Sequence, residues 1–219
     1  MAHHFIELLE DLKERVARMT CNVQQIVERA CESIINGDIA LADQVVKLDR
    51  EIDSEEVEVE EHAIGLLALH QPAASDLRLV TTIIKVNSDF ERIADCAVNV
   101  AQRVPTLNAD GKYTLPPDVR LMANTVVGIL RDTVKAFNLN DESLARQVLR
   151  GDDLVDALYH QIVQEMLHTL ENDPASASRE LANIMIAKNL ERIGDHCTNI
   201  AEDIVYVHSG NIIRHRRAV

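Results

Sequence analysis

Two acidic motifs, one hundred residues apart, contain the side chains with the clearest capacity for chemistry. Residues 91–101 read ERIADCAVNVA and residues 191–201 read ERIGDHCTNIA, so six of the eleven positions are identical. Each motif carries a Glu and, four residues later, an Asp: Glu91 and Asp95 in the first motif, Glu191 and Asp195 in the second. On an α-helix, two residues at this spacing lie about 5–6 Å apart on one face. Each motif therefore presents two carboxylates that repel each other unless a cation lies between them.

A second acidic pair with the same spacing lies upstream of each motif. These pairs are Asp49 and Asp53 in the first half, and Asp152 and Asp156 in the second half. If the chain turns near Ala73, the first pair lies 24 and 20 residues before the turn, and the motif carboxylates lie 18 and 22 residues after it. Counted from Pro174, the corresponding numbers are 22 and 18 before the turn, and 17 and 21 after it. Antiparallel hairpins would bring four carboxylates to nearly one level in each half.

Four converging acids predict a metal site in each half. The acids lie beside the apolar stripes of their helices, at the edge of the core, where like charges raise one another's pKa unless cations neutralise them. Oxygen donors suit Mg²⁺, Mn²⁺, Ca²⁺ or iron, whereas zinc prefers nitrogen and sulfur. The alternative is a solvated acidic face with salt bridges to Arg92 or Arg192; the repetition in both halves favours metal. The predicted ligands are Asp49, Asp53, Glu91 and Asp95 at one site, and Asp152, Asp156, Glu191 and Asp195 at the other.

The elements that must position these acids are long helices. The chain has 219 residues, 47% of them hydrophobic, with only 7 Gly and 5 Pro, a composition typical of helical proteins. Apolar residues three and four apart predict helices over about 5–35, 39–70, 76–103, 117–138, 141–171 and 176–206. In the second of these helices the predicted buried stripe ends at Leu69. Gly37 and Asp38 are expected to end one helix and cap the next, and Ser75 or Asp76 to cap the third.

The repeat extends through each half of the chain. Residues 41–45 (LADQV) match residues 144–148 (LARQV), and Pro72 and Pro174 lie 102 residues apart. Duplication of a three-helix unit explains both matches. The sequence therefore predicts an all-α fold of two pseudo-symmetric antiparallel three-helix bundles. The predicted bundles are residues 1–104 and 118–219, joined by a linker over 105–117 that is rich in helix breakers.

Charge, cysteine usage and the absence of catalytic motifs restrict the classes of function. A formal net charge of −14 argues against a nucleic-acid partner. The four cysteines form no Cys-x-x-Cys pair and are expected to be reduced thiols in the cytoplasm. No apolar run approaches the roughly 20 residues of a membrane span, so we expect membrane contact only through partners. The sequence has no glycine-rich phosphate loop, nucleophile elbow or catalytic triad pattern, which favours a protein that is not an enzyme.

Several other polar residues have two interpretations. The glutamates of residues 55–61 are expected to form a solvated face or, alternatively, a flank that attracts cations. Glu165 and His168 have the spacing of a di-iron site, but such sites need two of these motifs, so His168 is predicted to lie at the surface or in packing. Asn99 and Asn199 either hydrogen-bond to a neighbouring carboxylate or simply pack, and Cys96 and Cys197 are expected to be buried. The basic residues 214–217 form either an end without fixed structure or a contact for an acidic partner or a phospholipid surface.

The doubled motif, with an Asp-x-x-x-Asp pair and a Pro-containing turn before each copy, resembles the PhoU family of phosphate-transport accessory proteins over essentially the whole chain. The resemblance implies two similar three-helix bundles, a homodimer, and metal clusters held by the eight acids. It also implies a negative regulator of the phosphate-starvation response in the bacterial cytoplasm, which links the phosphate ABC transporter to a membrane sensor histidine kinase. His196 stands where the first motif has Cys96, so the two sites are expected to differ in metal preference.

Two other functions remain open from the sequence. Carboxylate-bridged metals can activate water or oxygen, which would make the chain a di-metal enzyme of the oxidase or phosphohydrolase class. Alternatively, the acids only solubilise a metal-free helical adaptor.

Overall fold

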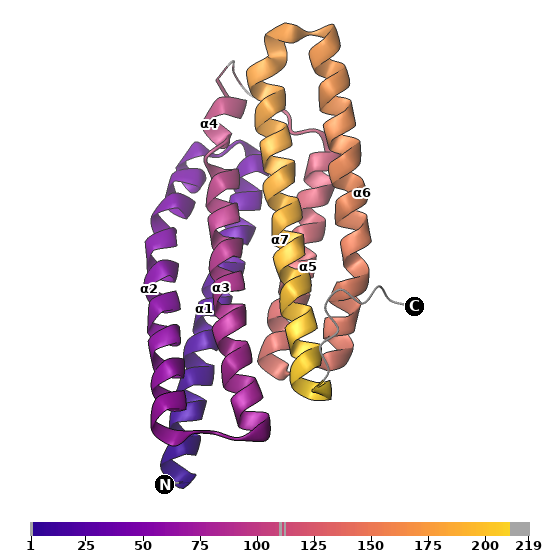
Figure 1. Cartoon of the computed structure of the whole chain (residues 1–219). Helices are drawn as coiled ribbons and strands as arrows, with labels where there is room; N and C mark the ends of the chain where they lie inside the picture. Colours follow the sequence, from indigo (N-terminus) through magenta and orange to yellow (C-terminus); the bar gives the residue numbers. More distant parts are fainter. Residues whose placement is uncertain (1, 110, 112, 211–219) are drawn as a thin grey trace.

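A computed structural model describes residues 2–109, 111 and 113–210, which form six long helices, one short helix and a 3₁₀ turn (Figure 1). The basic segment 214–217 lies outside the described residues. The elements are α1 (Ala2–Asn36), α2 (Ile39–His70), α3 (Ala74–Ala101), α4 (Val104–Leu107), α5 (Pro117–Leu139), α6 (Glu142–Asn172), η1 (Pro174–Ser176) and α7 (Ala177–Ser209).

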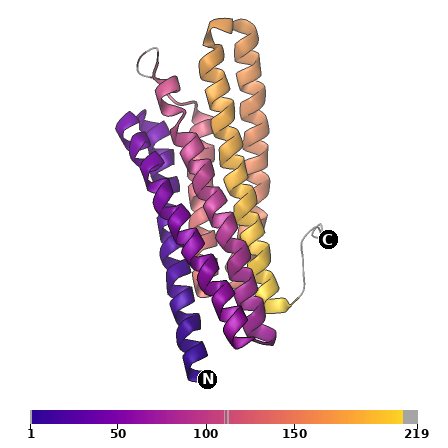
Figure 2. The same cartoon turned by 60° about the vertical axis from the view of Figure 1, so that its left-hand side comes forward.

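The helices pack as two antiparallel three-helix bundles, which confirms the predicted architecture. Helices α1, α2 and α3 contact one another, and so do α5, α6 and α7. The bundles meet mainly where α3 lies along α7, and additionally where α1 contacts α5. Figures 1 and 2 show that the α2–α3 hairpin and the α6–α7 hairpin point in opposite directions. One cluster of buried residues includes Phe90, Ile93, Leu190 and Ile193, so the core continues from one bundle into the other.

Local sequence signals explain most helix ends. Gly37 adopts a φ of +65° after α1, and the Asp38 carboxylate accepts a hydrogen bond of 3.0 Å from the Leu41 N–H at the start of α2. Asp141 caps α6 in the same way. The predicted cap of α3 is wrong: Ala73 occupies the cap position and makes no side-chain bond, while Asp76 already lies in the first turn.

The predicted apolar stripe of the first helix is confirmed, whereas that of the second fails at its end. All seven predicted positions of α1 are buried: Leu9, Leu12, Val16, Met19, Val23, Ile26 and Ala30. Leu69 in α2 is 78% exposed. Leu69 lies in the last turn of α2, two residues before the C-cap Gln71, so the buried stripe ends at Leu66, one turn before the helix does. Leu48 is half-buried against the core.

The connection between the bundles is more ordered than the breaker-rich sequence indicated. It contains the short helix α4, and Val104, Leu107 and Leu115 are buried. The Asn108 side chain donates hydrogen bonds to the carbonyl of Val104 at 3.0 Å and to that of Gly37 at 3.4 Å. The connection therefore packs against both bundles, with α4 in contact with α2 and α7, because its apolar residues reach the shared core between the breakers. The division into domains at 104 and 118 stays a prediction.

Three of the four cysteines are buried, including Cys96 and Cys197 as predicted, and Cys21 is exposed. Among the helices of the described residues, none has the length and apolar character needed to cross a membrane.

Candidate metal centre

Three of the four predicted ligands in the second half converge. Asp152 and Asp156 on α6 and Asp195 on α7 each offer a carboxylate oxygen, and these atoms all lie within 4.8 Å of one another. Among the residues that the structure describes, no other group of three His, Cys, Asp or Glu side chains meets this condition. Asp152 is half-buried, and the other two carboxylates are exposed, so the cluster lies at the surface edge of the α6–α7 pair.

Gly194 on α7 lies against Val155 and Asp152 of α6 at this cluster. A Cβ atom added at Gly194 would lie 3.4 Å from Val155 Cγ1 and 3.5 Å from Asp152 Oδ1. The Asp152 carboxylate therefore lies directly over the backbone of α7. Thr198, one turn later, donates its hydroxyl to the Gly194 carbonyl at 3.1 Å, and it also interacts with the Asp152 side chain.

The cluster carries unbalanced negative charge. Burial, followed by repulsion from the carboxylates of Asp156 and Asp195, raises the pKa of Asp152 to about 6, while Thr198 opposes the shift. Partial desolvation also raises the pKa of Asp195, followed by repulsion from Glu191 and Asp156. These shifts mean that the ionised cluster is unfavourable on its own and would be relieved by a cation. Clustered carboxylate oxygens fit a hard divalent or trivalent ion.

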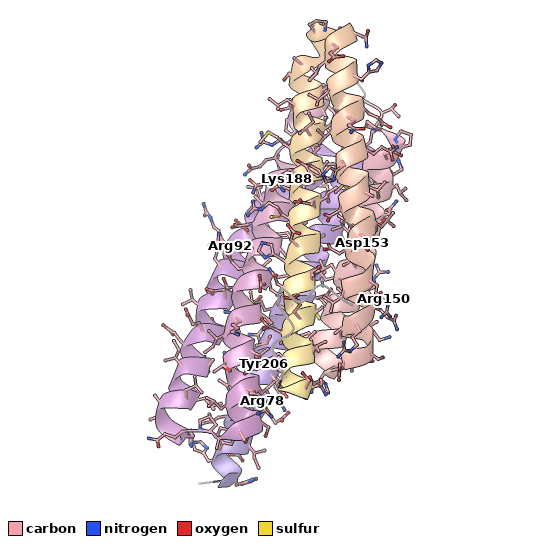
Figure 3. All side chains as sticks on the ribbon, turned by 45° about the vertical axis from the view of Figure 1, so that its right-hand side comes forward. Arg78, Arg92, Arg150, Asp153, Lys188 and Tyr206 are labelled. Atoms are coloured by element: carbon pink, nitrogen blue, oxygen red, sulfur yellow. The ribbon has the colours of Figure 1, made fainter. Side chains whose placement is uncertain are left out.

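Glu191, the fourth predicted ligand, is held apart from the cluster. Its Oε2 atom accepts a hydrogen bond of 2.6 Å from Nζ of Lys188, one turn earlier on α7. The Lys188 ammonium also lies 5.2 Å from the centre of the Tyr159 ring on α6. Figure 3 labels Lys188 on α7. The protein thus supplies its own cation beside one of the four acids.

In the first half a guanidinium takes the corresponding position. Arg92 donates through Nη1 to Asp95 Oδ2 at 3.0 Å, and its Nε lies 3.3 Å from Glu91 Oε2. This is the salt bridge that the sequence offered as the alternative to metal. Asp49, Asp53, Glu91 and Asp95 do not form a group of three oxygens within 4.8 Å among the described residues.

The first four acids nevertheless lie near enough to repel one another. Burial raises the pKa of Asp49, and the charges of Asp53 and Asp95 add to this shift. Burial also raises the pKa of Glu91, followed by Asp95, while Arg92 lowers it. Metal binding at this site stays a prediction, and it would require the Arg92 side chain to move away from the carboxylates.

The glutamate run on α2 is not only a solvated face. Glu55 accepts hydrogen bonds from Asn22 at 2.9 and 3.0 Å and from Arg18 at 3.2 Å, which fastens α2 to α1. Glu58 contacts Arg15 at 3.4 Å. Glu56 faces the first acid cluster, since burial raises its pKa and Glu60 and Asp53 raise it further. Glu56 is therefore the member of the run that extends the first site.

His196 faces the other bundle and not the acid cluster. Its Nδ1 atom lies 2.8 Å from Oδ1 of Asp89 on α3, and both side chains are largely buried. The pair joins the two bundles where α3 lies along α7. The predicted difference in metal preference stays a prediction, but its cause would not be direct ligation by His196 in this geometry. His168 is exposed, as expected.

Three residues that shape the second site were not selected from the sequence: Lys188, Gly194 as a point of contact with α6, and Thr198. The one signal for them was the difference between the two repeats, since Ser88, Ala94 and Val98 stand at the equivalent positions. That difference shows that the two halves diverge, but it does not show which contacts the changed residues make.

The comparisons of this chain with known proteins all point to one family. A family model described as PhoU domain matches residues 16–104 and 119–204, one match in each bundle. The chain is 36% identical over 208 residues to a phosphate-specific transport system accessory protein PhoU homolog of Aquifex aeolicus, covering 95% of this chain and 94% of the relative.

Solved structures with the same fold carry related descriptions. The crystal structure of PhoU from Pseudomonas aeruginosa matches with a TM-score of 0.90 and 36% identity, over 94% of this chain and 100% of that chain. The phosphate transport system regulatory protein PhoU from Streptococcus pneumoniae matches with a TM-score of 0.87 and 26% identity, over 95% and 98% of the two chains. These relatives are named as accessory and regulatory proteins and not as enzymes.

Proposed function

We propose, from the premise that this chain belongs to the PhoU family of phosphate-transport accessory proteins, that it is a metal-dependent regulator of phosphate transport. The observation that carries the metal-dependent part is the convergence of the carboxylates of Asp152, Asp156 and Asp195 from two helices, where burial and mutual repulsion outweigh the partial neutralisation of Asp195 by Lys188. A purely solubilising face would separate like charges, whereas this arrangement concentrates them.

The proposed ions are Mg²⁺, Mn²⁺ or iron. Asp152, Asp156 and Asp195 would hold one site, with Glu191 joining if Lys188 releases it. Asp49, Asp53, Glu91 and Asp95 would hold the second, weaker site. A bound ion would supply charge neutralisation and a crosslink between the helices of each hairpin. The protein's own residues orient the donors, because Thr198 interacts with the Asp152 side chain and the α7 backbone at Gly194 lies against it.

The proposed regulatory role is to couple phosphate supply to gene expression. The chain would act in the cytoplasm as a homodimer, contact subunits of the phosphate ABC transporter, and signal to a membrane sensor histidine kinase. When phosphate is plentiful it would repress the phosphate-starvation response. The names of the relatives, which place them with the phosphate-specific transport system, support the transporter as the first partner.

Metal analysis tests the first part of this proposal. We expect protein purified without chelators to retain metal, and the Asp152→Asn/Asp195→Asn variant to retain much less. Asp132→Asn removes a charge from an exposed position on α5 and serves as the matched control, which should keep the metal. Equal metal content in all three proteins would contradict the metal proposal and favour a metal-free adaptor.

Gene deletion tests the regulatory part. Loss of the gene should derepress alkaline phosphatase in phosphate-rich medium, and the unmodified gene should restore repression. Repression that persists without the gene would contradict the regulatory proposal, whatever the metal content. Complementation with the Asp152→Asn/Asp195→Asn gene then shows whether the metal site serves the regulation.

A further inference from the structure

A cavity of about 380 Å³ lies between the two bundles, where α7 ends. Four helices line it: α1, α3, the end of α5 and the end of α7. Its wall is mostly apolar and includes Val16, Ile83, Phe137, Ile204 and Val207. In Figures 1 and 2 the last turns of α7 lie beside the half of α3 that is nearer the α2–α3 turn. The cavity plays no part in the candidate metal centre, which lies farther along α6 and α7.

One buried polar group in the cavity wall has no partner. Thr82 on α3 is only 2% exposed, and its hydroxyl makes no hydrogen bond within the described part of the chain. Burial of a hydroxyl without a partner is unfavourable. The wall therefore favours an occupant that brings a polar backbone group together with apolar side chains.

The rim of the cavity is acidic. Glu10, Lys13 and Glu14 of α1 line it, and the Lys13 ammonium is already held by Glu10 at 2.8 Å. The rim thus carries one excess negative charge. An occupant with apolar residues followed by basic residues would match both the wall and the rim.

Helix α7 ends next to this cavity. Gly210 has a φ of +67° and donates its N–H to the Tyr206 carbonyl at 2.9 Å, which ends the helix and turns the chain. His208 Nε2 lies 2.5 Å from the carbonyl oxygen of Asn140. Because Asn140 itself lines the cavity, this contact fixes the last turn of α7 at the cavity edge.

The sequence that follows has the required composition. After Gly210 come Asn211, Ile212 and Ile213, and then Arg214-His215-Arg216-Arg217; all of these lie outside the described residues. Val207 is about 4.5 Å along the helix axis from Gly210. Two or three extended residues span about 7–10 Å, and four to seven span about 13–25 Å. The isoleucines can therefore reach the cavity wall, and the arginines can reach its rim.

We propose that residues 212–217 bind in this cavity of the same chain. Ile212 and Ile213 pack against the apolar wall, the backbone of the segment pairs with the Thr82 hydroxyl, and the arginines lie near Glu10 and Glu14. The segment then fastens α7 of the second bundle to α1 and α3 of the first. This inference does not depend on metal binding or on the role in phosphate regulation.

Disulfide crosslinking in the full chain tests the proposal. In a Cys21→Ser background, Ala17→Cys places a thiol in the cavity wall, and Ile213→Cys places one in the segment. Gly65→Cys replaces Ala17→Cys in the control, because an added side chain at Gly65 on α2 meets no atom within 4 Å. We expect monomeric disulfide to form at least tenfold faster in the cavity pair than in the control pair. Equal rates would overturn the proposal, and disulfide-linked dimers would assign the cavity to a second copy.

Two further changes separate binding from mere proximity. Adding Ile212→Asp to the cavity pair keeps the reach of the segment but removes the apolar contact, and it should slow crosslinking about tenfold. Glu14→Lys should slow it several-fold, whereas Glu51→Lys, the same change at an exposed position on α2, should not. An unchanged rate with Ile212→Asp would show that the segment is only nearby, which overturns the proposal. Circular dichroism of each reduced variant verifies that the bundles are folded.

Discussion

The two acid clusters come from one duplicated motif, but their surroundings differ. In the second half, Asp152, Asp156 and Asp195 face one another within 4.8 Å. In the first half, Asp95 and Glu91 face Arg92, at 3.0 and 3.3 Å. The motif therefore determines which helices and which level carry the acids. The neighbouring residues determine whether the acids face each other or a cation of the protein.

Small differences between the repeats account for this divergence. Gly194 lies against the Asp152 carboxylate, whereas the equivalent residue in the first half is the buried Ala94. Thr198 interacts with Asp152, whereas the equivalent Val98 has no polar group. We infer that the second site is preorganised for a cation, and that the first site must exchange Arg92 for it.

The largest expected effect is the loss of metal affinity in the second half. Asp195→Asn removes one of three converging oxygens, so Mn²⁺ affinity at that site should fall by more than the roughly 10–100-fold that loss of an outer-shell partner costs. Asp95→Asn should change the tighter of the two Mn²⁺ binding steps by less than about threefold. Isothermal titration calorimetry of both variants measures this. A larger effect of Asp95→Asn on the tight step would reverse the assignment of the stronger site.

The pH dependence of stability should also separate the two sites. The pKa of Asp152 is raised from 3.8 to about 6, so the folded, metal-free protein binds this proton more tightly than the unfolded chain. Its stabilising contribution is full below about pH 4 and is lost as the pH rises through about 6. Two pKa units correspond to about 3 kcal/mol, and solvent screening at this half-exposed carboxyl reduces the contribution to about 1–2 kcal/mol.

Denaturant unfolding between pH 4.5 and 7.5 in the presence of a chelator measures this slope. Asp152→Asn should flatten the slope, and the exposed Asp132→Asn should not. Saturating Mn²⁺ should reverse the trend, because metal binding requires the deprotonated carboxylates. A slope that is identical in the three metal-free proteins would show that Asp152 carries no such strain.

A smaller effect should follow from removing the cation of the first site. Arg92 has a side chain that is 54% exposed, so Arg92→Gln should lower stability by less than about 1 kcal/mol. The same change should raise Mn²⁺ affinity at the first site several-fold, because the carboxylates lose their competing partner. Lys188→Gln is the matched variant in the second half, where it frees Glu191. If neither variant alters Mn²⁺ binding, protein cations do not control access to the sites.

The helices and the position of the acid clusters along them could be predicted from the sequence. The contact partners of individual side chains could not. Apolar spacing and turn residues define the six long helices (α1, α2, α3, α5, α6 and α7) because burial follows helical periodicity. The counts from Ala73 and Pro174 bring the acids together because hairpin helices rise equally per residue. The exposure of Leu69, the α4 helix and the pairing of His196 with Asp89 depend on packing between elements, which no local pattern encodes.

The smallest expected effect concerns Gly194. Replacing a helical Gly by Ala usually stabilises a helix by about 0.5–1 kcal/mol, and Gly128→Ala in α5, where an added Cβ meets no atom within 4 Å, should give the full gain. Gly194→Ala should give a similar gain, because the new Cβ would meet Val155 Cγ1 at 3.4 Å and Asp152 Oδ1 at 3.5 Å, which are ordinary van der Waals distances. Thermal and denaturant unfolding of the metal-free variants measure the difference. A much smaller gain at Gly194, or a loss of stability, would show that the missing Cβ is needed for the packing of α7 against Asp152, whereas similar gains would leave the contrast between the two sites to Thr198 and to the protein cations.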